Sequence, residues 1–351
     1  MIKPGVATGD QVQAIFQLAK QKGFALPAVN VTSSSTVNAV METAAKLNSP
    51  VIIQFSNGGG QYFAVKGLSN AGEKAAILGS ISGARHVHAL AEAYGATVIL
   101  HTDHCAKNLL PWIDGLLDAG EAFFKETGKP LFSSHMIDLS EEPLAENLEI
   151  CQHYLRRMSK IGMTLEIELG ITGGEEDGVE AKHDAKLYST PEDALMTIET
   201  LGTDVNARYM VAATFGNVHG VYKPGNVVLQ PKILATLQEA VSAKLGLPAG
   251  SKPMDLVFHG GSGSLLSEIR ESLDYGVIKM NIDTDTQYAF TRPVVEHMLK
   301  NYDGVLKIDG EVGNKKAYDP RAWGKAAEAG MAARVAHACE DLRSTGTSLK
   351  K

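Results

Sequence analysis

Four potential metal ligands in the sequence, three histidines and one glutamate, each stand at or near the end of a short apolar segment. His104 lies in LHTDHC, Glu168 in LEIELG, His219 in FGNVH and His259 in VFH. Imidazole nitrogens and carboxylate oxygens are ligands of zinc, and a catalytic zinc keeps one coordination position open for a substrate. A single histidine at such a position is more often an ordinary buried residue, but the position that all of them share favours a catalytic zinc site.

Two aspartates belong to the same pattern. Asp103 directly precedes His104, and Asp138 ends the apolar segment 131–138. Asp138 could bind the metal or orient a histidine through a hydrogen bond, and both interpretations stay open. Cys105, which follows His104, is interpreted as a small buried thiol rather than a reactive one.

Two later segments combine glycine with short polar residues. They read HGGSGS over 259–264 and NIDTDT over 281–286. Glycine lets backbone N–H groups converge on a phosphate, because no side chain blocks the approach. Flexible turns use the same residues, but the location of the two segments favours a binding site for a small phosphorylated molecule.

The segment GITGGEEDGVEAKHDAKLY, residues 170–188, mixes glycines with the adjacent acids Glu175, Glu176 and Asp177. This mixture suits a lid that brings a carboxylate base over the metal site after substrate binds. A solvated acidic loop would have the same composition, so the two interpretations stay open.

Lys279 offers a rival chemistry, because a desolvated lysine can form a Schiff base with a ketone. The alternative is an internal ion pair with Glu166 or Asp255, which are also expected to point inward. We favour the ion pair.

Eight short apolar or alternating segments could position these side chains. We expect strands at 25–31, 50–56, 97–103, 131–138, 163–170, 210–216, 255–261 and 277–283. Helical patterns separate them, such as Thr36–Leu47 behind a serine-rich start signal. The sequence therefore predicts an α/β fold, a (β/α)8 TIM barrel with additional helices. Such barrels place their chemistry at the C-terminal ends of the strands and often bind phosphate after strands seven and eight.

We expect one domain over residues 1–351, with a mobile loop at about 171–188 and a C-terminal helical extension. Alternation within 163–169 (MTLEIEL) predicts which side chains face inward, since successive residues of a strand point to opposite faces. The apolar row should contact the helices. The other row, Thr164, Glu166 and Glu168, should face the barrel interior.

Composition narrows the function classes. The chain has 351 residues, 44% hydrophobic, and a formal charge of -7, so partners such as nucleic acid or an anionic membrane are not expected. We find neither a run of 18 apolar residues nor a signal peptide, and we expect a cytoplasmic protein. The 3 cysteines are expected to be free thiols.

Together these segments resemble the class II, zinc-dependent fructose-1,6-bisphosphate aldolases, in particular their longer, dimeric subgroup. The resemblance runs over nearly the whole chain. The matching segments are LPAVNV, QFSNGG, ILHTDHCAK, LFSSHMIDLSEE, MTLEIELGITGGEEDG, FGNVHGVYKPGN, VFHGGSGS, KMNIDTDTQ and NKKAYDPRAW.

The resemblance implies reversible cleavage of fructose 1,6-bisphosphate to dihydroxyacetone phosphate and glyceraldehyde 3-phosphate, through a zinc-stabilised enediolate, in glycolysis and gluconeogenesis. It implies these metal ligands, the carboxylates at the zinc or at a second metal position: His104, Asp138, Glu168, His219 and His259. It also implies three catalytic residues: Asp103 at the C4 hydroxyl, Glu176 at the proton of dihydroxyacetone phosphate, and Asn281 near the enediolate.

The resemblance further implies substrate-binding residues at both phosphate ends: Asn30, Ser56, Gly220, Gly260, Gly261, Ser262, Asn281, Ile282, Asp283, Thr284, Lys315 and Arg321. Family members place a monovalent cation, Na⁺ or K⁺, beside one phosphate, here near Val218, Gly220 and Gly260. A homodimer is implied, in which Arg321 reaches the partner's site.

Two other functions are considered. A tagatose-1,6-bisphosphate aldolase would share the metal, the phosphate sites and the acid, and it differs in the configuration of C4. A zinc hydrolase on a barrel would use metal-bound water, but the paired phosphate segments argue against it.

Overall fold

The structure is a computed structural model of the chain. It describes residues 3–64, 67–170, 173–176, 179–181, 188–204, 206–219, 229–261, 263–306 and 312–348, with the backbone alone for 173–176, 179–181 and 219. Among the helices it describes, none is long and apolar enough to cross a membrane.

The strands of the described residues form two sheets. In chain order they are β1 (Gly5–Val6), β2 (Leu26–Asn30), β3 (Val51–Phe55), β4 (Thr97–Thr102), β5 (Ser134–Ile137), β6 (Thr164–Leu169), β7 (Gly173–Glu176), β8 (Val179–Ala181), β9 (Tyr209–Ala213), β10 (Val218–His219), β11 (Leu256–Phe258) and β12 (Val277–Ile282). The larger sheet has 9 strands in the order β1-β4-β3-β2-β12-β11-β9-β6-β5. All its ladders are parallel.

The larger sheet curls so that two strands distant in its order, β4 and β5, meet. The N–H of Ser133 donates to the carbonyl of Leu100 at 2.8 Å, and the N–H of Asp138 donates to that of Cys105 at 2.9 Å. Each of the eight predicted strand segments overlaps with one strand of this sheet. The fold is therefore a mixed α/β fold around a curled parallel sheet, and β1 is an additional short strand that the sequence did not predict.

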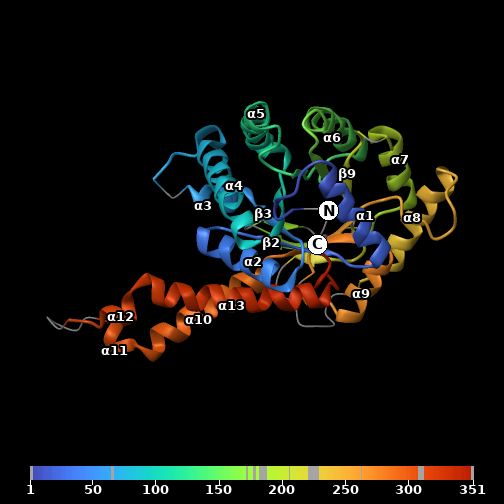
Figure 1. The fold of residues 1–351 in the computed structure, drawn as a ribbon. Helices are drawn as coiled ribbons and strands as arrows, with labels where there is room; N and C mark the ends of the chain where they lie inside the picture. The colour runs from blue at the N-terminus through green and yellow to red at the C-terminus, as the bar shows by residue number, and fades with distance from the viewer. Residues whose placement is uncertain are drawn as a thin grey trace.

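Helices surround the curled sheet (Figure 1). They are α1 (Asp10–Lys22), α2 (Ser34–Leu47), α3 (Asn57–Phe63), α4 (Lys74–Tyr94), α5 (Leu110–Thr127), α6 (Leu144–Ser159), α7 (Pro191–Leu201), α8 (Lys232–Lys244), α9 (Leu266–Asp274), α10 (Thr284–Lys300), α11 (Tyr302–Val305), α12 (Lys315–Tyr318), α13 (Pro320–Asp341) and the 3-10 helices η1 (Ala71–Glu73) and η2 (Lys107–Leu109). The predicted helix start is confirmed at α2, where Ser33 and Thr36 form a reciprocal capping box.

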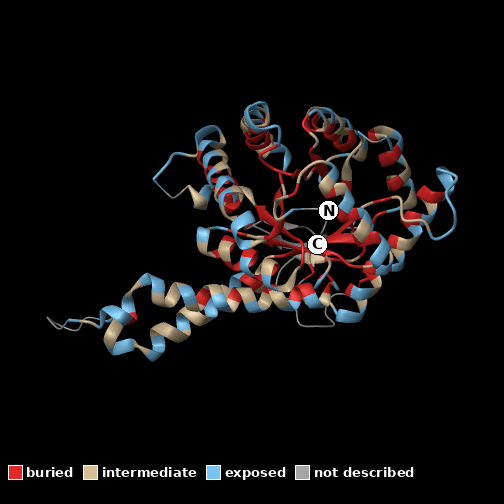
Figure 2. Cartoon of the chain, in the orientation of Figure 1, coloured by how far each residue is buried: buried red, intermediate tan, exposed pale blue. Residues whose placement is uncertain are grey.

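Buried residues concentrate in the strands and on the inner sides of the helices (Figure 2). The main apolar cluster lies between strands and helices and includes Leu165, Ile167 and Leu169 of β6. A second apolar cluster joins α1 to the N-terminal parts of the strands, through residues such as Phe16 and Ile99. The apolar residues thus fill the layer outside the sheet and its N-terminal end, which leaves the other end for polar side chains.

A buried ion pair also lies at the N-terminal end. Lys20 of α1 places Nζ 2.7 Å from Oδ1 of Asp255, directly before β11. The sequence left Asp255 as a candidate partner of Lys279, and this interpretation is wrong because Lys20 pairs with it instead.

The second sheet was not predicted. It pairs β10 with β7 in parallel and β7 with β8 in antiparallel fashion, so that Val218 lies opposite Gly173. β7 and β8 fall within the segment predicted as a mobile loop, about 171–188, much of which lies outside the described residues, whereas β10 follows β9 in the chain.

The C-terminal helices α10 to α13 form a hairpin that extends away from the curled sheet (Figure 1). Its far end carries α11 and α12, and α13 runs back to pack on α2 and α10. Large apolar side chains are exposed on it, including Tyr288, Leu299 and Tyr302.

A close contact between the backbones of α3 and α4 fixes the position of α3 after β3. A Cβ atom on Gly79 of α4 would lie 1.8 Å from the carbonyl oxygen of Gly60 in α3 and 2.7 Å from the nitrogen of Ala64. Backbone therefore meets backbone at this crossing, and only glycine fits.

We predict that Gly79→Ala lowers the free energy of unfolding by roughly 1–3 kcal/mol, because the added methyl group forces the two helices apart. Gly324→Ala in α13 is the matched control, since a Cβ there meets nothing within 4 Å. It should stabilise the protein by up to about 1 kcal/mol through helix propensity. Urea unfolding of both variants tests this, and equal effects would contradict the steric argument.

Candidate metal centre and active site

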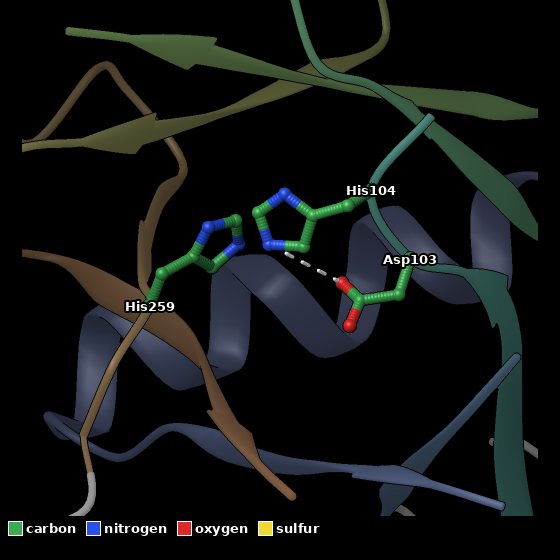
Figure 3. A group of neighbouring side chains, drawn as sticks. All are labelled: Asp103, His104 and His259. Carbon is green, nitrogen blue, oxygen red and sulfur yellow. Dashed lines mark ion pairs between the residues drawn. The ribbon is translucent and has the colours of Figure 1, made fainter. Parts of the chain in front are cut away.

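Polar side chains from different strands converge at the C-terminal ends of the curled sheet. Asp103 and His104 follow β4, and His259 follows β11 (Figure 3). The rings of His104 and His259 lie with centroids 4.6 Å apart at 57°. Asp103, His104 and His259 form one group whose ligand atoms lie within 4.8 Å of one another.

His104 also belongs to a second group, with Asp138 and Glu168. Its Nδ1 lies 2.8 Å from Oδ2 of Asp138 and 3.6 Å from Oε2 of Glu168. Asp138 is held in turn by Ser140, whose hydroxyl and N–H donate to Oδ1 at 2.7 and 3.1 Å. With Nδ1 occupied in this way, His104 presents Nε2 toward Asp103, 4.0 Å away.

His259 is oriented from the opposite side. Its Nε2 lies 2.8 Å from Oε1 of Glu166, and its Nδ1 lies 3.4 Å from Oε2 of Glu168. The predicted inward facing of Glu166 and Glu168 is therefore confirmed. The site combines imidazole nitrogens with buried carboxylates, which is a donor set that suits a divalent metal ion.

Neighbouring charges shift the pKa values of this cluster. Burial alone would raise the pKa of Asp103, but the charges of His104 and Lys279 outweigh it and lower the value to about 2. Burial would also raise the pKa of Asp138, but hydrogen bonds from His104 and Ser140 hold it well below its usual range. For His259, burial acts to lower the pKa, and hydrogen bonds to the nearby glutamates raise it to about 9. The aspartates are thus ionised near neutral pH, which favours a bound cation.

Three side-chain amides hold the carboxylate of Asp103. Its Oδ2 accepts hydrogen bonds from Asn30 at 3.0 Å and Gln54 at 2.9 Å, and its Oδ1 accepts one from Asn281 at 3.0 Å. Gln54 also donates to Oδ1 of Asn30 at 2.6 Å. The sequence predicted Asn30 and Asn281 for the site but not Gln54. Gln54 reaches Asp103 because it lies directly opposite Asn30 and His101 in the ladders, a register that the sequence alone does not give.

Lys279 lies inside the sheet and is fully buried. Its Nζ lies 3.0 Å from Oε1 and 2.8 Å from Oε2 of Glu166. The favoured interpretation, an internal ion pair with Glu166, is confirmed. Glu166 was predicted to face inward, but its contact with His259 was not foreseen.

The residues predicted around one phosphate lie at the ends of β11 and β12. Gly260 has φ +63°, which favours glycine, and a Cβ on Gly261 would lie 2.0 Å from Cε of Met280, so a larger residue there would displace the end of that side chain. Ile282 ends β12, Asp283 precedes α10, and Thr284 begins it. Gly220 and Ser262 lie outside the described residues.

Other predicted residues are placed less completely. His219 and Glu176 have only their backbones described, in β10 and β7, where His219 pairs with Gly174. Val218 precedes His219 in β10. Ser56 caps α3, where its hydroxyl accepts a hydrogen bond from the N–H of Gly59 at 3.0 Å.

Lys315 and Arg321 are not brought to this cluster within one chain. Both are exposed, in α12 and at the start of α13, at the far end of the helical hairpin (Figure 1). Arg321 instead pairs with Asp319, with Nη2 2.7 Å from Oδ2.

The thiol predictions are confirmed. Cys105, Cys151 and Cys339 are buried free cysteines. Burial raises the pKa of the Cys105 thiol far above its ordinary value, so it is a poor nucleophile beside His104.

Comparison with known protein families shows which family this chain belongs to. Residues 10–347 match the family "Fructose-bisphosphate aldolase class-II". The chain belongs to this class II aldolase family. The resemblance drawn from the sequence motifs is thereby confirmed.

Related proteins agree over nearly the whole length of the aldolase chain. It is 59% identical over 352 residues to "Fructose-bisphosphate aldolase class 2" of Escherichia coli (strain K12), covering 97% of this chain and 96% of the relative. It is 58% identical over 351 residues to "Fructose-bisphosphate aldolase" of Edwardsiella ictaluri, with the same shares. The crystal structure of fructose-bisphosphate aldolase from Campylobacter jejuni superposes with a TM-score of 0.87 at 52% identity, covering 98% of this chain and 97% of that one.

We predict that His104→Ala removes most bound metal from this aldolase, because His104 belongs to both candidate groups. His86→Ala is the matched control, since His86 bonds to Asn38 on the outer helices, at 2.9 Å. Metal per chain after dialysis, measured by plasma mass spectrometry, should fall in the first variant and not in the second. Full metal content in His104→Ala would contradict the assignment.

Proposed function

We propose that this chain catalyses the reversible cleavage of fructose 1,6-bisphosphate to dihydroxyacetone phosphate and glyceraldehyde 3-phosphate, as a step of glycolysis and gluconeogenesis. The observation that carries the proposal is the group Asp103, His104 and His259 at the C-terminal ends of the strands. Family membership and the names of the relatives support the substrate.

The proposal includes a single closed (β/α)8 barrel over residues 1–351. The backbone hydrogen bond from Ser133 to Leu100 supports closure between β5 and β4. Active sites of such barrels lie where these polar residues converge, at the C-terminal ends of the strands.

We further propose that the metal is zinc, held by His104, His219 and His259, with Glu168 and Asp138 at the same or a second metal position. The donor set fits, because imidazole nitrogens and carboxylate oxygens of described residues lie within 4.8 Å of one another in two groups that share His104. When bound, zinc supplies a Lewis acid that polarises the ketose carbonyl and stabilises the negative charge that develops on it.

Asp103 is the proposed base for the C4 hydroxyl of the sugar. Its three amide contacts leave the carboxylate ordered beside His104, so that it can accept the proton as the C3–C4 bond breaks. Asn281 both orients Asp103 and has an Oδ1 without a hydrogen-bond partner among the described residues, which suits contact with substrate. Glu176 would transfer the proton at C3 of the ketone product, dihydroxyacetone phosphate.

The two phosphates would bind at opposite ends of the site. One end comprises Gly220, Gly260, Gly261, Ser262, Ile282, Asp283 and Thr284, with a monovalent cation near Val218, Gly220 and Gly260. Ser56 and Asn30 would serve the other end. Binding energy from both phosphates would align the reacting bond over the metal.

A homodimer would complete the second phosphate end. Arg321 and Lys315 are exposed on the hairpin, away from the cluster of their own chain, and large apolar side chains of the hairpin are also exposed. This arrangement supports a role for Arg321 in the site of a second copy.

We predict that EDTA abolishes cleavage of fructose 1,6-bisphosphate and that added zinc restores it. Tagatose 1,6-bisphosphate should be cleaved much more slowly, and borohydride with substrate should leave activity intact because Lys279 is held by Glu166. A coupled assay of triose phosphate release measures all three. Activity that survives EDTA and is lost with borohydride would contradict the metal mechanism, and release of inorganic phosphate would favour a hydrolase.

We predict that Asp103→Asn lowers kcat by roughly 10²–10⁴-fold, because the base is lost, while metal content stays normal. Asp118→Asn, at an exposed aspartate paired with Arg157, is the matched control and should keep full activity. Near-normal turnover of Asp103→Asn would remove it from the mechanism.

A further inference from the structure

We infer that Glu166 is a positioning residue of the metal centre, which holds His259 in the one tautomer and ring orientation that offers Nδ1 to the metal. The inference rests on the metal site proposed above and names a residue outside the ligand set. Glu166 lies in β6, two residues before Glu168, and its side chain is fully buried inside the sheet.

Four short contacts define the surroundings of Glu166. Oε1 lies 2.8 Å from Nε2 of His259 and 3.0 Å from Nζ of Lys279. Oε2 lies 2.8 Å from the same Nζ and 3.1 Å from Nε2 of His101. His101 is anchored in turn on β5, where its Nδ1 lies 2.8 Å from the hydroxyl of Ser134.

These contacts decide which nitrogen of His259 keeps its hydrogen when a metal ion binds the other nitrogen. A carboxylate only accepts hydrogen bonds, so Nε2 of His259 must be the donor to Oε1. The remaining nitrogen, Nδ1, lies on the side of Glu168, 3.4 Å from Oε2, within the group of potential metal ligands. A carboxylate behind a metal-binding imidazole fixes its tautomer and increases its strength as a ligand.

Lys279 is the counter-ion of Glu166. Its ammonium group touches both oxygens of Glu166, and it is fully buried with a 0% exposed side chain. An uncompensated charge would be costly here, so the lysine and the glutamate stabilise each other. The inward lysine is thus a counter-ion for the positioning carboxylate.

The arrangement makes Glu166→Gln an informative change. The carbonyl oxygen of a glutamine would pair with the ammonium group of Lys279, since that group can only donate. Its amide nitrogen would then face Nε2 of His259 as a donor. This reversal favours the hydrogen on Nδ1, which is the nitrogen that the metal requires.

The experiment compares wild type, Glu166→Gln and Asp255→Asn. Asp255 is the matched control, because it is also a buried carboxylate paired with a lysine, Lys20 at 2.7 Å, but lies at the N-terminal end of the sheet. Affinity for Zn²⁺ is measured by competition with a chromophoric chelator, and the site is followed through visible absorption of the Co²⁺-loaded protein. We expect Glu166→Gln to bind Zn²⁺ roughly 10–100-fold more weakly, with an altered Co²⁺ spectrum. Asp255→Asn should lower thermal stability and leave both readouts unchanged.

The tautomer itself is measured on metal-free protein labelled with ¹⁵N-histidine, at a pH above the His259 pKa of about 9, where the ring is neutral and carries one hydrogen. Long-range ¹H–¹⁵N spectra, with His259→Gln to assign the signal, should show hydrogen on Nε2 in wild type and on Nδ1 in Glu166→Gln. If Glu166→Gln does not fold by circular dichroism, Glu166→Asp replaces it. The shorter carboxylate keeps the charge for Lys279 but withdraws from His259, so Zn²⁺ binding should again weaken.

Unchanged Zn²⁺ affinity and an unchanged His259 tautomer in the folded variant would overturn the inference. Equal losses of affinity in Asp255→Asn would also overturn it, because the effect would then follow from stability. Failure of the proposed function is a distinct result: wild type itself would bind no Zn²⁺, whereas the tautomer measurement would still decide the role of Glu166.

Discussion

The buried carboxylate of Glu166 is the interaction on which the interior depends. An inward-facing charge inside a curled sheet is costly unless it is paired and hydrogen-bonded. Here one carboxylate pairs with Lys279 and also contacts His101 and His259. Polar side chains of β4, β6 and β12 and of the residue that follows β11 thereby meet at one point, next to the candidate metal ligands.

The two ends of the curled sheet differ in polarity. The N-terminal end is filled by the apolar cluster with α1, and the Lys20–Asp255 ion pair joins the helix to the sheet there. The C-terminal end carries the histidines, acids and amides. Because all strands of the larger sheet are parallel, residues as distant in sequence as Asn30 and Asn281 reach the same carboxylate of Asp103.

Much of this could be predicted from the sequence, because strands of a buried parallel sheet have apolar segments and a period of two. That pattern placed all eight strand segments and the inward face of β6, and the Lys279–Glu166 pair followed from it. Pairings between segments, such as Gln54 with Asp103, depend on ladder register and left no local signal. The sheet of β7, β8 and β10 was missed because its glycines and acids carry no apolar alternation, and the position of Arg321 depends on a helical hairpin whose direction no local pattern encodes.

The contact of Gly60 with Gly79 limits which substitutions are tolerated around Ser56. Helix α3 begins at this serine and is set against α4 backbone to backbone, so neither glycine can be exchanged without moving the helix that orients Ser56. Gln61 and Tyr62, in contrast, are exposed on the same short helix. In a library of variants selected for cleavage of other sugar phosphates, substitutions at these two exposed positions would change the surface near Ser56 without moving α3 against α4.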